Sequence, residues 1–255
     1  ESAATEFAQF SDVIDKPFLL GAKLLPVYRG SPTENIHYSL VDATNNHVVQ
    51  IDEASGEMSI IGAGAAEIKV IQHAPQYHQT VATQRFKVQI NPAKNLELQV
   101  ADISAAYNAD AQKTIKVTGA KGKQSFSLSE NANPDIINII DAEKGTFSFI
   151  GVGKTQVTIN DAGNQNYLAE SREINVEVTR INSNSLNSLD IQSRYQQNQT
   201  IQPQVIGGHG QLAYALSDSS PQDVISIDVN TGSMTVFKPG TVEVIITDDG
   251  GEFWA

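Results

Sequence analysis

The sequence contains no cysteine, which excludes disulfide bonds, thiol catalysis and cysteine-based metal sites. This absence does not identify a redox compartment, because exported proteins can also lack cysteine. Apolar runs are short as well: none approaches the ~18 residues of a membrane-spanning helix, so we expect no direct membrane insertion of this segment. Basic residues number 17 against 29 acidic ones, and the net charge of −12 argues against nucleic acid as a partner.

A start methionine and a recognisable signal peptide are also missing. The chain begins with Glu1, which suggests a processed product or an excised fragment. Its 255 residues suffice for one large domain or for two to three small ones.

The stretch GVGKT, residues 151–155, has the end of a phosphate-binding loop but not the rest of it. That loop needs a glycine where Ser148 stands, and a helix beginning at Lys154 whose N-terminal amides face the phosphates. The stretch TQVTI, from Thr155, alternates and is β-branched, which predicts a strand. We therefore predict a structural glycine corner here and no nucleotide site.

Three stretches of the chain repeat one pattern, with a spacing of 89 and then 87 residues between the recurring aspartates. Four residues after the aspartate comes a glycine, then a large apolar residue and, further on, a second glycine. The three sets are Asp52, Gly56 and Gly64; Asp141, Gly145 and Gly153; and Asp228, Gly232 and Gly240. Only the second glycine of GVGKT recurs in all three copies, so its lysine is incidental. A glycine just before a strand commonly supplies a positive-φ turn.

The second copy shows seven short stretches with strand character, separated by turn residues. They are residues 96–100, 113–119, 124–129, 136–140, 146–150, 155–159 and 172–178. No segment carries a sustained helical period. Seven short strands within one copy favour an immunoglobulin-like β-sandwich. An aromatic-x-Leu pair at Tyr38, Phe126 and Tyr214 is then expected to point into the core of each copy.

The third hairpin, VISIDVNTGSMTVFKPGTVEVIIT, resembles the group 2 bacterial Ig-like (BIg) repeat. The resemblance is carried by Asp228, Thr231, Gly232, Gly240, Thr241 and Ile246. The second copy has Lys154 where that repeat usually has threonine, and its segment NQNYLAESREINVEV resembles the closing strand of such repeats in intimin- and invasin-like adhesins. The first copy is the most diverged. The resemblance implies an all-β chain of three tandem Ig-like sandwiches.

The polar stretches NPAKN and INSNSLNS, at 91–95 and 181–188, read as short linkers. They divide the chain into domains at residues 1–92, 94–181 and 186–255. Only 15 residues come after Gly240, so we expect the third sandwich to lack its final strand in this chain. A strand edge left open in this way invites pairing, and a strand supplied by another chain is a possible partner.

The recurring aspartates are expected to cap hairpin turns through Asx hydrogen bonds rather than to ligate calcium. Asp248, Asp249 and Glu252 form an oxygen-rich turn, which makes them weak calcium candidates. They lack the spacing of a dedicated calcium loop, so a solvated turn is the default. The five histidines show no zinc-site spacing, and the sequence has no nucleophile-elbow motif. We expect no cofactor, no catalytic residue and no enzymatic activity.

Five tyrosines are candidates for stacking on sugars, although packing at strand ends is the favoured interpretation: Tyr28, Tyr77, Tyr107, Tyr167 and Tyr195. The leading functional hypothesis is a segment of a bacterial cell-surface or secreted protein that acts as an adhesin stalk or binding module. Its partners would be a protein or glycan on a host or neighbouring cell, and its location extracellular, with the periplasm as an alternative. Two rival hypotheses stay open: an accessory region of a secreted polysaccharide-active enzyme, and a structural component of a phage or envelope complex.

Overall fold

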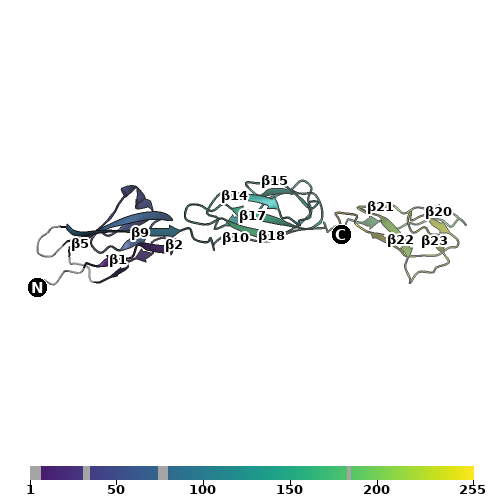
Figure 1. Ribbon diagram of the computed structural model, residues 1–255. Coiled ribbons are helices and arrows are strands. Elements are labelled where there is room, and N and C mark those ends of the chain that lie inside the picture. The colour runs from purple at the N-terminus through teal and green to yellow at the C-terminus, as the bar shows by residue number, and fades with distance from the viewer. Residues whose placement is uncertain (1–6, 31–34, 74–79, 183–184) are drawn as a thin grey trace, which may run out of the picture. The chain divides into compact units, whose positions relative to one another are not determined.

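The computed structural model describes residues 7–30, 35–73, 80–182 and 185–255. Its regular structure is almost entirely β-strand, so the predicted fold class of all-β Ig-like sandwich repeats is confirmed. Figure 1 labels a number of these strands and shows their order along the chain by colour. Within the described ranges, no helix has the length and apolar character needed to cross a bilayer.

The first copy forms two main sheets and a short strand pair. The four-stranded sheet has the order β2-β9-β8-β5, the three-stranded sheet has the order β3-β7-β6, and β1 pairs with β4. The bounds are β1 (Gln9–Phe10), β2 (Val13–Pro17), β3 (Lys23–Leu24), β4 (Tyr28–Arg29), β5 (Asn35–Leu40), the 3-10 helix η1 (Ala43–His47), β6 (Val49–Ile51), β7 (Met58–Ile60), β8 (Gly64–His73) and β9 (Thr80–Asn91).

Strand β8 shows why these residues form a sandwich. Ala66, Ile68 and Val70 alternate with more exposed residues, as one buried face of a strand requires. Strand β8 pairs antiparallel with β5 on one edge and with β9 on the other, and β2 runs parallel to β9. The parallel pairing of β2 with β9 was not predicted from the sequence.

The second copy repeats this arrangement. Its sheets have the orders β11-β18-β17-β14 and β12-β16-β15, and β10 pairs with β13. The bounds are β10 (Gln99–Val100), β11 (Ile103–Ala106), β12 (Gln112–Thr114), β13 (Val117–Thr118), β14 (Gln124–Leu128), β15 (Ile137–Asp141), β16 (Thr146–Phe149), β17 (Gly153–Asp161) and β18 (Glu170–Thr179).

Two details of the second copy differ from the sequence analysis. The expected strand at 113–119 is divided into β12 and β13, which pair with different neighbours. Strand β11 was missed. Its sequence, ISAA, is short and carries little strand signal. It is held in the sheet by its parallel pairing with β18, about 70 residues later in the chain.

Up to β25, the third copy has counterparts of the elements of the second copy except β11, since no strand is described between β19 and β20. Its sheets are β20-β24-β23, β22-β25 and β19-β21. The bounds are β19 (Asn187–Ser188), β20 (Thr200–Ile201), β21 (Val205–Ile206), β22 (Leu212–Leu216), β23 (Ile225–Ile227), β24 (Met234–Val236) and β25 (Val244–Asp248). Among the described residues, no strand pairs with the second edge of β25.

Contacts group the chain into two compact units. One comprises residues 1–101, 116–126 and 158–172, and the other comprises 102–115, 127–157 and 173–255. The first unit holds a large core cluster that includes Met58, Ile68 and Val88. The second holds a small cluster of Val224, Ile225 and Met234. The three domain boundaries drawn from the sequence stay a prediction.

Candidate functional site

The recurring aspartates cap the hairpins between the strands of the three-stranded sheets. The Asp52 carboxylate accepts hydrogen bonds from the backbone N–H of Ala54 (3.2 Å) and Ser55 (2.7 Å) and from the Ser55 hydroxyl (2.7 Å). The Asp228 carboxylate accepts the matching set from Asn230 (3.0 Å) and Thr231 (2.8 Å for each donor). These are Asx turns, in which a side chain substitutes for a backbone acceptor.

Asp141 has the same backbone partners but a different third contact. Its carboxylate accepts from the N–H groups of Glu143 and Lys144, both at 3.0 Å, and the Lys144 ammonium lies 3.2 Å from its other oxygen. Hydrogen bonds from the backbone N–H groups of Ser55, Lys144 and Thr231 lower the pKa of Asp52, Asp141 and Asp228, respectively. All three aspartates are therefore held ionised by the turn that they cap.

The first glycine of each hairpin has a left-handed backbone. The φ angles are +72° at Gly56, +68° at Gly145 and +68° at Gly232. A Cβ at Gly56 would lie 2.8 Å from the Tyr38 ring, and one at Gly232 would lie 2.7 Å from the Tyr214 ring. The buried aromatic residue of the aromatic-x-Leu pair thus packs directly under the hairpin glycine, which explains why the two features recur together.

The second glycine corrects the expectation of a shared positive-φ turn. Gly64 and Gly153 have φ angles of +142° and +138°, but Gly240 is not in that region. What the three share is close packing: a Cβ would lie 3.0 Å from Val48, 2.9 Å from Ile136 and 2.7 Å from Val224, respectively. The glycine is therefore needed for space beside one branched side chain in each copy.

The strand predicted after the second glycine of GVGKT is present. Gly153 begins strand β17 rather than a helix, so no helix N-terminus faces a phosphate position. The Lys154 ammonium lies 3.3 Å from the carboxylate of Glu177 on the neighbouring strand, β18.

The carboxylates of the acidic turn after β25 are engaged by backbone N–H groups. Asp248 accepts from His209 (2.7 Å), Gly210 (2.8 Å) and Gly250 (3.0 Å), and the His209 bond leads the causes that lower its pKa. Asp249 accepts from Gln211 (2.7 Å) and Gly251 (3.0 Å). Glu252 is exposed in the same turn. No cluster of three or more potential metal ligands occurs among the residues described, and calcium binding here stays a prediction.

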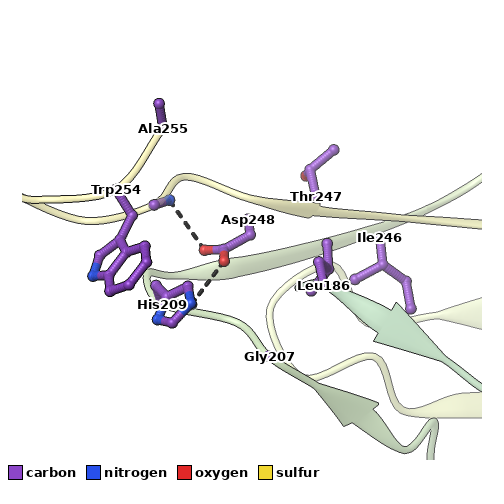
Figure 2. A pocket seen from close by; sticks show the side chains of 9 residues that line it. Leu186, Gly207, His209, Ile246, Thr247, Asp248, Trp254 and Ala255 are labelled. Carbon is purple, nitrogen blue, oxygen red and sulfur yellow. Dashed lines mark hydrogen bonds between the residues drawn. The ribbon is translucent and has the colours of Figure 1, made fainter. Parts of the chain in front are cut away.

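Two pockets stand out. The first has a volume of about 210 Å³ and lies beside the acidic turn. Figure 2 shows the Trp254 and His209 rings side by side at this pocket, and the ring centroids are 3.7 Å apart at an interplanar angle of 4°.

The second pocket is an open groove of about 510 Å³ on the first copy, lined by Ser39, Leu40, Ala43, Asn46, Val49, Gln50, Ile51, Glu53 and Ile61.

The nearest approach to a catalytic set at the first pocket is Ser185, His209 and Asp248. The Ser185 hydroxyl lies 3.1 Å from His209 Nε2, but it also donates to the Gly207 carbonyl at 2.9 Å. Asp248 binds the backbone N–H of His209 and so does not orient the imidazole ring. A serine triad needs the acid on the ring nitrogen, so this arrangement does not provide an activated nucleophile.

The candidate tyrosines have diverse surroundings. Tyr107 stacks on Phe253 at 4.2 Å, and Tyr167 packs edge-on against Phe18 at 5.5 Å and lies under the Lys121 ammonium. Tyr28 packs against Phe10, and Tyr195, 47% exposed, donates from its hydroxyl to the Phe237 carbonyl. Tyr77 lies outside the described residues. The His209–Trp254 pair was not predicted, because two residues 45 positions apart give no local signal.

Comparison with known proteins gives no family assignment. No family model and no curated protein sequence matches the chain. Among solved structures, the chain is similar to human CDH23 EC21-23 (14% identity, 97% of this chain and 96% of that chain, TM-score 0.36) and mouse cadherin-23 EC22-24 (16%, 96% and 94%, 0.32). It also matches Drosophila N-cadherin EC1-4 (14%, 89%, 0.31), of whose chain it spans 64%. At these TM-scores and identities the similarity carries no argument about function.

Proposed function

We propose that this chain is a non-catalytic tandem Ig-like segment of a bacterial cell-surface or secreted protein, acting as an adhesin stalk or binding module. The observation that carries this proposal is the threefold recurrence of one hairpin corner with its capping aspartate. In the first and third copies the hairpin glycine also lies over an aromatic ring. Three copies of a structural corner suit a repeated spacer, because each copy adds length and surface without adding a reacting group. The resemblance of the Asp228 hairpin to the BIg repeat supports the bacterial assignment and an extracellular location.

An exposed apolar pair in the first copy supports direct binding over a purely passive spacer. Leu25 and Val27 are 64% and 57% exposed between β3 and β4. The strand registers place Thr114 and Lys116 at the equivalent positions of the second copy. A surface that is apolar in one copy and polar at the same positions of another favours a contact role for the first copy.

The test is a cell-binding assay and a glycan array with the full chain, repeated with the double variant Leu25→Thr and Val27→Lys. These substitutions introduce the residues of the second copy, so the strand should tolerate them. We expect the double variant to bind at least about 10-fold more weakly, since two desolvated apolar side chains each contribute on the order of 1 kcal/mol. The matched control is Ile206→Thr, which changes an apolar residue 65% exposed on β21.

The outcomes separate the functional hypotheses. Binding to cells supports the adhesin module, binding to glycans alone favours the accessory region of a polysaccharide-active enzyme, and silence in both assays favours a passive spacer. Turnover of a glycan or ester substrate by the purified chain would overturn the non-catalytic assignment.

A strand supplied by another chain belongs to the same proposal, supported by the second edge of β25, which pairs with no described strand. In the first copy the equivalent edge of β8 holds β9. A labelled peptide with the sequence of β18 (Glu170–Thr179) is the probe, and a peptide with serine at its Ile174, Val176 and Val178 positions is the control. Equal binding of the two peptides would contradict strand addition, because the apolar face of the added strand should provide the specificity.

A further inference from the structure

The stretch between the first two copies is held by the loop after β17. The backbone N–H of Ala93 donates to the carbonyl of Asn166 at 2.9 Å, and the N–H of Leu168 donates to the carbonyl of Ala93 at 2.9 Å. These two bonds form a parallel bridge between Ala93 and Tyr167. The stretch NPAKN was predicted to be a short linker, but its backbone is paired as in a sheet at Ala93.

The stretch between the second and third copies is held in the same way. The N–H of Ile181 donates to the carbonyl of Phe253 at 2.8 Å, and the N–H of Ala255 donates to the carbonyl of Ile181 at 2.9 Å. A parallel bridge joins Ile181 to Trp254. Ile181 comes 88 residues after Ala93 and Trp254 comes 87 after Tyr167, so the register of the joint repeats with the period of the copies.

At the first joint, two amide side chains also bind the backbone of the glycine corner of the first copy. The Ala63 N–H donates to Asn166 Oδ1 at 2.7 Å, and Gln165 Nε2 donates to the Ala63 carbonyl at 2.8 Å. Ala63 lies between Gly62 and Gly64 and is 2% exposed. Gln165 and Asn166 thus satisfy both backbone polar groups of a buried residue, which would otherwise lose their hydrogen bonds.

The second joint keeps the backbone bridge but uses other side chains. Glu252 and Phe253 occupy the positions of Gln165 and Asn166. The Phe253 ring stacks on Tyr107 at 4.2 Å, whereas at the first joint Tyr167 packs edge-on against Phe18 at 5.5 Å. One joint therefore depends on amide hydrogen bonds and the other on an aromatic stack.

We propose that the linker residue between two copies is a docking site for the loop between β17 and β18, or its equivalent, of the following copy. At the first joint the glycine corner of the first copy forms part of this docking surface. At the first joint the docked loop stabilises the corner beneath it, so the first two copies are coupled in folding there. The receptor of this contact is the corner at residues 62–64 of the first copy, which occupies the place of the GVG of GVGKT in the second copy. Because Gln165 and Asn166 make these bonds, the first joint is specific for a following copy that has glutamine and asparagine at these two positions.

The test is amide hydrogen exchange on the full chain. In the unaltered protein, the N–H groups of Ala63, Ala93 and Leu168 should exchange at least about 10-fold more slowly than in an unstructured peptide, because each is hydrogen bonded within the joint. In the double variant Gln165→Ala and Asn166→Ala, we expect exchange at Ala63 and at its corner neighbours Ile61 and Gly62 to rise by about 10-fold or more. Ile61 and Gly62 donate to the Val48 carbonyl within the first copy, so they report on the corner itself.

Two controls make the result specific. The variant Asn138→Ala, at an exposed asparagine on β15, should leave exchange at the corner unchanged. The Ile181 N–H of the second joint should not respond to the double variant. Free exchange at Ala93 and Leu168 in the unaltered protein, or no response at Ile61 and Gly62 in the double variant, would overturn the proposal. Because the readout involves no ligand, its failure is distinct from failure of the adhesive function.

Discussion

Strands β8 and β25 occupy equivalent places in the first and third copies but differ in burial. The pairing registers match Ile68 with Val244 and Val70 with Ile246, since each pair faces the same aromatic-x-Leu positions across the sheet. Ile68 and Val70 are fully buried, whereas Val244 and Ile246 are half-buried. Strand β8 lies between β5 and β9, while β25 pairs with β22 alone among the described strands.

The comparison shows that the inward residues of this strand are covered more fully in the copy where both of its edges are paired. The core clusters reflect this, because the first copy has a large cluster of buried residues and the third a cluster of three. Both copies nevertheless keep the same capped hairpin and the same glycine over an aromatic ring. Local corners thus form independently of how complete the sandwich around them is.

The largest expected difference between the copies is in how much free energy of unfolding is lost when an inward-facing isoleucine is truncated to alanine. Ile68→Ala should lower the free energy of unfolding of the first copy by about 3–4 kcal/mol, because the side chain is fully buried and leaves a cavity. Ile246→Ala should cost about 1–2 kcal/mol, since its site already borders solvent. Denaturant unfolding monitored by residue-resolved exchange measures both, with Trp254 fluorescence as a separate probe of the third copy. Equal losses would contradict the difference in burial.

The second prediction concerns the hairpin glycines, where the two copies should behave alike. Gly56→Ala and Gly232→Ala should each cost about 2–3 kcal/mol, because a left-handed backbone is strained and the added Cβ meets a tyrosine ring. Gly21→Ala is the matched control: its φ is +76° but no atom lies within 4 Å of the added Cβ, so we expect about 1 kcal/mol. Thermal unfolding of the three variants gives the comparison. A cost at Gly21 as large as at Gly56 would show that the ring contact contributes nothing.

The third prediction is an alkaline effect in the first copy. Burial, with a smaller contribution from Tyr28, raises the pKa of Tyr38 to about 12. The folded-state pKa is therefore above the ordinary value of about 10, so the neutral phenol is favoured in the folded copy. Its contribution is fully present below pH ~10 and should be lost as the pH rises toward 12. Absorbance titration of the phenolate, with Tyr38→Phe as the control, tests this; a transition near pH 10 assigned to Tyr38 would contradict it.

The smallest expected effect is acid destabilisation at the capping aspartates. Hydrogen bonds lower the folded-state pKa of Asp52 and Asp228 below the usual value of about 3.9. The stabilisation is therefore present above that value and is lost as the pH falls through the folded-state pKa. NMR titration of the carboxyl carbons should give depressed midpoints in both copies. The variants Asp52→Asn and Asp228→Asn keep an oxygen acceptor, and they should abolish the pH-dependent part while retaining most of the turn.

Much of the candidate site was predictable because its chemistry is local. Asp52, Asp141 and Asp228 cap turns formed by the next two or three residues, and a glycine four positions later is part of the same hairpin. The role of Gly240 was not predictable, because its requirement is the nearby Val224 side chain rather than its own φ. The His209–Trp254 stack was not predicted either, because it too depends on a contact between residues that are distant in the sequence.

Local patterns in the sequence by themselves determined most strands of the second copy, the threefold repeat and the capped corners of this protein, because alternation and turn chemistry involve neighbouring residues. Only the tertiary structure decided that Ala93 and Ile181 pair with Tyr167 and Trp254, and that β2 and β11 run parallel to β9 and β18. It also decided how deeply β25 is buried. These features depend on contacts between residues more than 70 positions apart, or on which edges of a sheet are filled, and no pattern within one strand encodes either.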